Sequence, residues 1–248
     1  MTFVFIALAG LIVGSFLTVC IYRIPLSQSI VFPRSYCPHC QKSLTPMELI
    51  PLLSYLLLAG QCRHCQQAIA FRYPAVELLT AILFAFCFAA WGWSSRLIAA
   101  WIFSSFLVVI TWIDLEHQLV LNRVLVWFSL AGFFAGAGLG TPVLADMLIA
   151  AAGGGSCMLL IAVLSRGGMG GGDIKLTAAL GIWLGWQGTL LALFLAFVFA
   201  GLTGVFLLLA RIKGRKDMIP FAPFLCAGAF MALVYGAKLL TWYFGLTR

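Results

Sequence analysis

Long apolar runs constrain the fold of this chain more than any other feature of its sequence. Eight runs contain few or no charged residues, and a helix needs about 20 apolar residues to cross a bilayer. They cover residues 2–22, 74–93, 97–113, 124–139, 143–164, 174–186, 189–210 and 219–244. Barrel strands would instead alternate in polarity over about ten residues. We therefore predict an all-α polytopic membrane protein with about eight transmembrane helices, of which 174–186 is short for a full crossing.

The composition excludes a soluble domain. Hydrophobic residues make up 63% of the chain, against roughly 45–50% in soluble domains, and charged residues make up 9%, against roughly 25%. So few polar side chains cannot cover the surface of a soluble protein of 248 residues.

The net charge of +8 indicates membrane topology and not nucleic-acid binding. Lys and Arg collect in cytoplasmic loops of membrane proteins. An outside N-terminus places the loops 23–72, 114–123, 165–173 and 211–217 in the cytoplasm, and twelve of the fifteen basic residues then lie in or beside them. We therefore expect both termini on the outer, periplasmic side. The first run ends at a basic residue and has none before it, which favours an uncleaved helix.

Two of the seven acidic residues fall at the same predicted edge of the membrane. Asp114 ends the third span, and Asp173 opens the sixth. Two carboxylates in a partly apolar site cannot both ionise at low cost, so one keeps a proton and the pair can act as general acid and general base on water. The alternative is two helix-end aspartates that never meet. Glycines before Asp173 would allow a backbone or a substrate strand to approach that carboxylate.

Glu77 lies one turn into the second span. An ionisable group at that depth is costly, so it is expected either to function or to pair with a basic group.

Four cysteines form two CxxC pairs in the cytoplasmic segment. Cys37 and Cys40 are followed, after 21 residues, by Cys62 and Cys65. This spacing is typical of a structural zinc site with four thiolate ligands, and a reducing cytoplasm favours metal over disulfide. The isolated cysteines are expected to be small buried side chains; they are Cys20, Cys87, Cys157 and Cys226.

The chain resembles the bacterial type IV prepilin peptidases, also called leader peptidase–N-methyltransferases, a GxGD-type aspartic membrane protease family. The motifs that carry this resemblance are Gly14-Ser15-Phe16-Leu17, Tyr22-Arg23-Ile24-Pro25, Arg34-Ser35-Tyr36-Cys37-Pro38-His39-Cys40, Ile50-Pro51 with Ser54-Tyr55, Gly60-Gln61-Cys62-Arg63-His64-Cys65, Arg72-Tyr73-Pro74 with Glu77, Ile113-Asp114-Leu115-Glu116-His117-Gln118, Gly170-Gly171-Gly172-Asp173-Ile174-Lys175-Leu176 and Ile219-Pro220-Phe221-Ala222-Pro223-Phe224. The sequence departs from the family pattern at Thr18 and at Val120-Leu121-Asn122.

The resemblance implies a bifunctional enzyme with zinc and S-adenosylmethionine as cofactors. It would cut the leader from type IV prepilins or pseudopilins at the cytoplasmic membrane face and then methylate the new N-terminal amine. Asp114 and Asp173 match the catalytic aspartates, and Cys37, Cys40, Cys62 and Cys65 match the cysteine knuckles linked to methyl transfer. The expected domains are 1–22 (first helix), 23–73 (zinc segment) and 74–248 (seven-helix peptidase).

Other site residues are less constrained by the sequence. We expect Gly170, Gly171, Gly172 and Lys175 to border the path of the substrate. No nucleotide-binding motif is present, so the S-adenosylmethionine site stays unknown, with Arg72 and Glu77 as candidates. Two alternative functions are a peptidase without methyl transfer and a zinc-stapled transporter that uses the aspartates as a cation relay.

Overall fold

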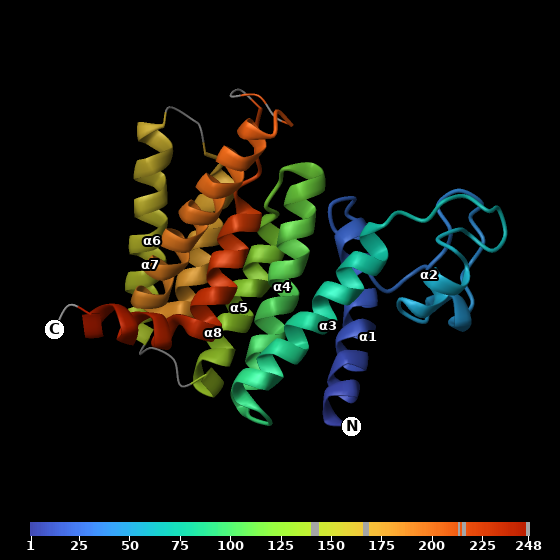
Figure 1. Ribbon diagram of the computed structural model, residues 1–248, viewed down its shortest axis with the longest axis horizontal. Helices are drawn as coiled ribbons and strands as arrows, with labels where there is room; N and C mark the ends of the chain where they lie inside the picture. Colours follow the sequence, from blue (N-terminus) through green and yellow to red (C-terminus); the bar gives the residue numbers. More distant parts are fainter. Residues whose placement is uncertain (140–143, 166–168, 213, 215–216, 247–248) are drawn as a thin grey trace. The chain divides into compact units, whose positions relative to one another are not determined.

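The computed structural model describes residues 1–139, 144–165, 169–212, 214 and 217–246 (Figure 1). Its elements are α1 (Thr2–Arg23), η1 (Pro46–Leu49), α2 (Leu53–Leu57), α3 (Arg72–Trp91), α4 (Ser95–His117), α5 (Asn122–Leu139), α6 (Leu144–Leu164), α7 (Gly171–Leu209) and α8 (Ala222–Leu246). Among the described residues, six helices are long and apolar enough to cross a membrane, and Asn122–Ala135 in α5 is a shorter apolar stretch. The predicted all-α polytopic fold is confirmed.

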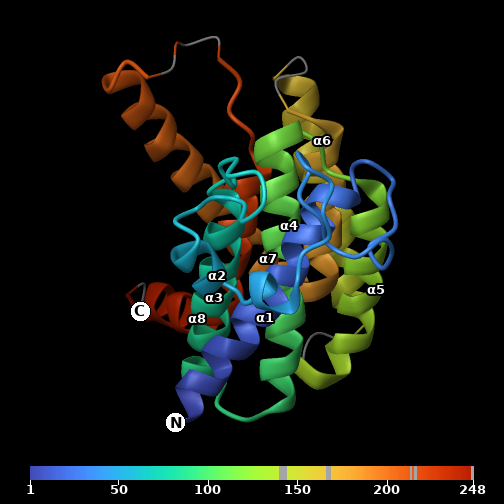
Figure 2. The same cartoon turned by 90° about the vertical axis from the view of Figure 1, so that its right-hand side faces the viewer.

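The first of two compact units, Met1–Leu97, pairs α1 with α3 (Figure 2). Two glycines of α1 allow this close approach. A Cβ at Gly10 would lie 2.6 Å from the Cα of Ala81, and a Cβ at Gly14 would lie 2.7 Å from the Cα of Glu77. The segment between the two helices carries η1, α2 and both CxxC pairs.

The second unit, Ile98–Arg248, holds the helices from α4 onward. An aromatic cluster in its core joins Phe103 of α4, Phe128 of α5 and Trp183 of α7. The Trp183 indole N–H donates a hydrogen bond of 2.9 Å to the Phe128 carbonyl, so its polar atom is satisfied inside the core.

Helix α7 contains two of the predicted spans. Its 39 residues would measure about 58 Å as one straight helix, roughly twice the thickness of a bilayer core. Gly185 interrupts it with φ 65° and ψ −175°, a conformation that favours glycine. Thr177 before this break and Thr189 after it both face Gly154 of α6, so the two halves fold back along the same helix. The half before the break is short, as expected for 174–186.

Candidate active site and metal centre

Asp114 and Asp173 are brought together within the second unit. Asp114 lies in the last turn of α4, and Asp173 lies in the first turn of α7. Both side chains are buried, and their carboxylates are close enough to interact electrostatically. The predicted pairing at one end of the helices is therefore present, whereas their catalytic role is still a prediction.

The local backbone fixes the Asp173 side chain. Gly170 is the N-cap of α7, and its backbone N–H donates to the Asp173 carboxylate. This is the arrangement in which an acidic residue at the third helical position caps the helix start. The side chain therefore has a defined direction before any substrate binds.

Helix α8 supplies a third side of the aspartate site, which sequence reasoning did not identify. The backbone N–H of Ala222, the first residue of α8, donates to the Asp114 carboxylate. Such N–H groups have no partner within their own helix, so they are available to a carboxylate. Prolines at 220 and 223 mark this helix start in the sequence, but nothing in the sequence says which side chain the start faces.

One turn farther along α8, Cys226 lies beside the same pair. Its thiol interacts with the Thr111 side chain and is within electrostatic range of Asp114 and Asp173. Cys20, Cys87 and Cys226 are buried as expected, whereas Cys157 is exposed, so that expectation was wrong for this residue.

One oxygen of Asp114 is available for chemistry. Its Oδ2 atom is buried and has no hydrogen-bond donor among the described residues. A buried acceptor without a donor is costly, so this atom is suited to accept a hydrogen bond from a reactant.

The residues expected to border the substrate path differ in their surroundings. A Cβ at Gly172 would lie 2.8 Å from the Cβ of Val120, so the loop after α4 already fills that space. A Cβ at Gly171 would meet nothing within 4 Å. Gly170 adjoins the Asp173 carboxylate, and the Lys175 ammonium donates to Asn122 Oδ1 at 3.0 Å. Gly171 is therefore the open position among the three glycines, and a role for these residues in substrate approach stays a prediction. Gly167 and Gly168 lie outside the described residues.

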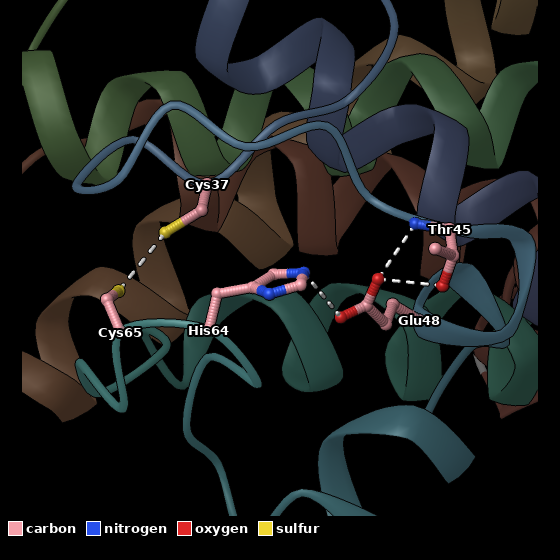
Figure 3. A network of polar contacts seen from close by, with 5 residues as sticks. All are labelled: Cys37, Thr45, Glu48, His64 and Cys65. Atoms are coloured by element: carbon pink, nitrogen blue, oxygen red, sulfur yellow. Dashed lines mark hydrogen bonds and ion pairs between the residues drawn. The ribbon is translucent and has the colours of Figure 1, made fainter.

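The four CxxC cysteines converge in the first unit. The Sγ atoms of Cys37, Cys40, Cys62 and Cys65 all lie within 4.8 Å of one another. Those of Cys37 and Cys65, the two cysteines drawn in Figure 3, are 3.8 Å apart. Tetrahedral zinc with Zn–S bonds of about 2.3 Å places its sulfurs about 3.8 Å apart. The cluster can hold a metal ion, and its donor set and size fit zinc.

Both knuckles use the same backbone pattern. The Cys37 N–H donates to the Lys42 carbonyl and the Cys62 N–H donates to the Gln67 carbonyl, at 3.0 and 2.9 Å. Gln41 and Gln66 close the two turns with positive φ. In the second turn, the backbone N–H groups of Cys65 and His64 lower the pKa of the Cys62 thiol to about 7, which favours the thiolate that a metal requires.

A polar network connects the second knuckle to the chain that follows the first (Figure 3). Glu48 accepts hydrogen bonds from the backbone N–H and the hydroxyl of Thr45, at 2.8 and 2.7 Å. These two bonds lower the pKa of Glu48. His64 Nε2 lies 3.8 Å from the same carboxylate. His64 thus contacts Glu48 and lies beside the thiolates without being one of the four clustered ligands.

The two candidate cofactor residues make contacts within the first unit. The Arg72 guanidinium lies over the rings of Tyr22 and Tyr73, at 5.5 and 5.0 Å from their centroids. The Glu77 Oε2 atom accepts the Leu52 N–H at 2.8 Å, and the Ser15 side chain bonds the same carboxylate. Glu77 therefore pairs with a backbone group and a hydroxyl, and its pairing does not require a basic residue.

Comparison with known proteins agrees with this arrangement. Residues 8–91 match the Bacterial Peptidase A24 N-terminal domain, and residues 101–205 match the Type IV leader peptidase family. The prepilin leader peptidase/N-methyltransferase of Bacillus subtilis is 41% identical over 94% of each chain. Proteins with the same name from Aeromonas hydrophila and Pseudomonas aeruginosa are 36% and 34% identical, over 97% and 95% of this chain and 93% and 91% of theirs. No solved structure matches the chain.

Two buried aspartates at one end of a set of long apolar helices form the kind of site that a membrane aspartic protease requires. The chain belongs to the type IV leader peptidase family.

Proposed function

We propose that the protein cleaves the leader from type IV prepilins or pseudopilins and then methylates the new N-terminal amine. The observation that carries the cleavage step is the buried pair of Asp114 and Asp173. The relatives are named for both activities, which favours a bifunctional enzyme over a peptidase without methyl transfer. The alternative function as a transporter is not favoured, because the chain belongs to a leader peptidase family.

In the cleavage step, one carboxylate of the pair takes a proton from water while the water oxygen attacks the carbonyl carbon of the scissile bond. The other carboxyl group, which is neutral, donates its proton to the carbonyl oxygen. The carboxyl group that gained the proton of water then protonates the amide nitrogen, while the ionised carboxylate takes a proton from a hydroxyl of the intermediate. The C–N bond breaks, the pair returns to one neutral and one ionised group, and the products are a carboxylic acid and an amine. The Ala222 N–H holds Asp114 in place while its Oδ2 atom faces the reactant.

We place this chemistry at the cytoplasmic edge of the bacterial inner membrane, with both termini outside. The distribution of Lys and Arg supports this orientation. A prepilin would then enter as an apolar helix with its basic leader left inside. The helix must unwind near the cut, and glycine leaves a helix at roughly 1 kcal/mol less cost than alanine.

The cofactors belong to the methyl-transfer function in this proposal. Zinc would bind Cys37, Cys40, Cys62 and Cys65 and staple the segment 23–73. S-adenosylmethionine would supply the methyl group as an electrophile. Two residues are candidates for the S-adenosylmethionine site. The Arg72 guanidinium is stacked on two tyrosine rings. The Glu77 carboxylate accepts the Leu52 N–H and so holds the backbone at Leu52 in place. The peptidase region in this proposal is 74–248, and its first helix, α3, packs on α1.

The mass of the reaction product tests the whole proposal. Membranes containing the protein are incubated with a purified prepilin and S-adenosylmethionine, and the product is weighed by mass spectrometry. Leader loss with an added methyl group is the expected result. Leader loss alone would support the peptidase without methyl transfer, and an intact prepilin would contradict the cleavage function.

Substitutions at the two adjacent glycines are expected to separate packing from substrate approach. Gly172→Ala should lower stability by about 1–3 kcal/mol, because the new Cβ collides with Val120. Adding Val120→Gly, which removes the Cβ that lies 2.8 Å away, should restore part of that loss in thermal unfolding, whereas Val120→Ala keeps this Cβ and should restore little. Gly171→Leu has room in the protein, so it should fold normally yet block cleavage of every prepilin while methylation of a pre-cleaved substrate survives. Normal cleavage by Gly171→Leu would show that the substrate does not pass this position.

Substitutions at Glu77 are expected to show whether its role is positioning. Glu77→Ala removes the acceptor of the Leu52 N–H, and loss of a hydrogen bond to a charged group, worth about 1.5–3 kcal/mol, should speed hydrogen exchange of this amide by roughly 10–100-fold. Glu77→Gln keeps an oxygen acceptor and is the matched control. If methyl transfer is lost in Glu77→Ala, where exchange is fast, and kept in Glu77→Gln, where exchange stays slow, Glu77 acts by positioning the loop. If Glu77→Gln keeps slow exchange and loses methyl transfer, its charge is used directly.

A further inference from the structure

The stretch 46–59 of the segment between α1 and α3 exposes an unusual number of large apolar side chains. It contains η1 and the five-residue helix α2. Met47, Leu56 and Leu57 are 77%, 72% and 76% exposed. Leu49, Ile50 and Leu53 are also exposed. A patch of this kind marks an interaction surface.

The anchor of this stretch sets its level along the transmembrane helices. Leu52 donates its N–H to Glu77, and Glu77 abuts Gly14 of α1. Glu77 lies five residues after Arg72, where α3 begins, and this corresponds to about 7.5 Å along the helix axis. The Glu77 side chain points back toward the start of α3, so Leu52 lies somewhat nearer to the membrane edge than Gly14 does. The stretch therefore lies alongside the helices, below their ends.

This level corresponds to the boundary between headgroups and acyl chains. Half of a bilayer core is about 15 Å thick, and helices that lie in the interface bury their apolar face by about 5–10 Å. Because α1 and α3 are long and apolar enough to span a membrane, a stretch anchored to Glu77 of α3 is within reach of the bilayer surface.

The charges around the patch fit a lipid surface. Lys42 and Arg63 flank the stretch, one in each knuckle, and both are exposed. Glu48 is the acidic residue of the stretch, and it is engaged by Thr45 and His64. Basic side chains beside an exposed apolar face favour the anionic headgroups of a bilayer.

We propose that residues 46–59 form an interfacial membrane element, with Met47, Leu56 and Leu57 among the acyl chains of one leaflet and Lys42 and Arg63 at its headgroups. The metal centre, which is attached at both sides of this element, is then held at the lipid surface. This contact needs neither prepilin cleavage nor methyl transfer, and it can be tested without either activity.

Photo-crosslinking of the full chain in vesicles tests the proposal. Benzoylphenylalanine replaces Leu56 in protein reconstituted into vesicles of phosphatidylglycerol and phosphatidylcholine that carry a traceable phospholipid. Phe5, exposed on α1, is the lipid-facing reference, and Gln67, exposed in the second knuckle, is the polar control. Position 56 is expected to label lipid at least about fivefold more than position 67 and at a level similar to position 5.

Two results would overturn the proposal. Lipid labelling at position 56 equal to that at position 67 would show that the stretch lies in water. Crosslinking of position 56 to an added prepilin, with loss of the lipid adduct, would show that the patch is a substrate surface. Normal thermal unfolding of all three variants ensures that labelling reports position and not misfolding.

Discussion

Replacing Asp114 or Asp173 with alanine is expected to reduce leader cleavage by roughly 10²–10⁴-fold, the contribution typical of one positioned acid or base. In the proposed mechanism the pair acts on one water, so losing either carboxyl group removes half of the proton transfers. Cleavage of a purified prepilin, followed by gel shift and mass, measures the effect. The double variant should be little worse than either single one, since residues that act as a unit are not additive.

Asparagine at the same positions separates charge from shape. Asp114→Asn and Asp173→Asn keep the size of the side chain but cannot exchange a proton, so both should be nearly as inactive as alanine. Folding is checked by thermal unfolding, and methylation of a pre-cleaved substrate should persist. Robust cleavage by either variant would exclude that residue from the catalytic pair.

The meeting of these aspartates was predictable because topology and charge distribution were enough to place them at one membrane edge. Apolar runs fixed the helices, and the order of the helices placed the end of α4 and the start of α7 on the same side. The contribution of Ala222 was not predictable, since a backbone N–H carries no residue-specific signal. Only the packing of α8 shows which carboxylate that N–H reaches.

The glycines show a second limit of sequence reasoning. Gly171 and Gly172 are identical in the sequence, yet one faces open space and the other faces Val120. Tertiary contacts decide whether the space beside a glycine is open to a substrate or filled by a neighbouring side chain. Gly185 shows the same dependence, because the sequence predicts two separate spans, and only the structure shows that the chain turns between them at this single glycine.

The cysteine cluster was predictable because it depends on local turns and less on the packing of distant helices. Two CxxC pairs can satisfy one metal ion through local turns alone, and the two turns have the same hydrogen bonds. The exposed leucines of the stretch 46–59 were present in the sequence as a modest apolar run. Their level relative to α1 becomes visible only through the contacts of Glu77.

Replacing Cys37 or Cys62 with serine is expected to release zinc and to impair methyl transfer far more than cleavage. A hydroxyl is a poor substitute for a thiolate, and structural zinc sites contribute about 10–16 kcal/mol of apparent binding energy to the fold they close. Metal content should fall from about one zinc per chain toward zero, and methyl transfer should fall by at least about tenfold. Metal analysis of purified protein and transfer of a labelled methyl group measure the two effects.

The asymmetry between the two activities follows from how each site is supported. Asp114 and Asp173 are fixed by helices of the second unit and by hydrogen bonds to Gly170 and Ala222. The segment between α1 and α3, by contrast, has short helices and few buried side chains, so its order depends on the four thiolates. Cys157→Ser, at an exposed isolated cysteine, is the matched control and should change neither activity. Equal loss of cleavage and methyl transfer in Cys37→Ser would show that the metal supports the whole protein, and full retention of zinc would show that Cys37 is not a ligand.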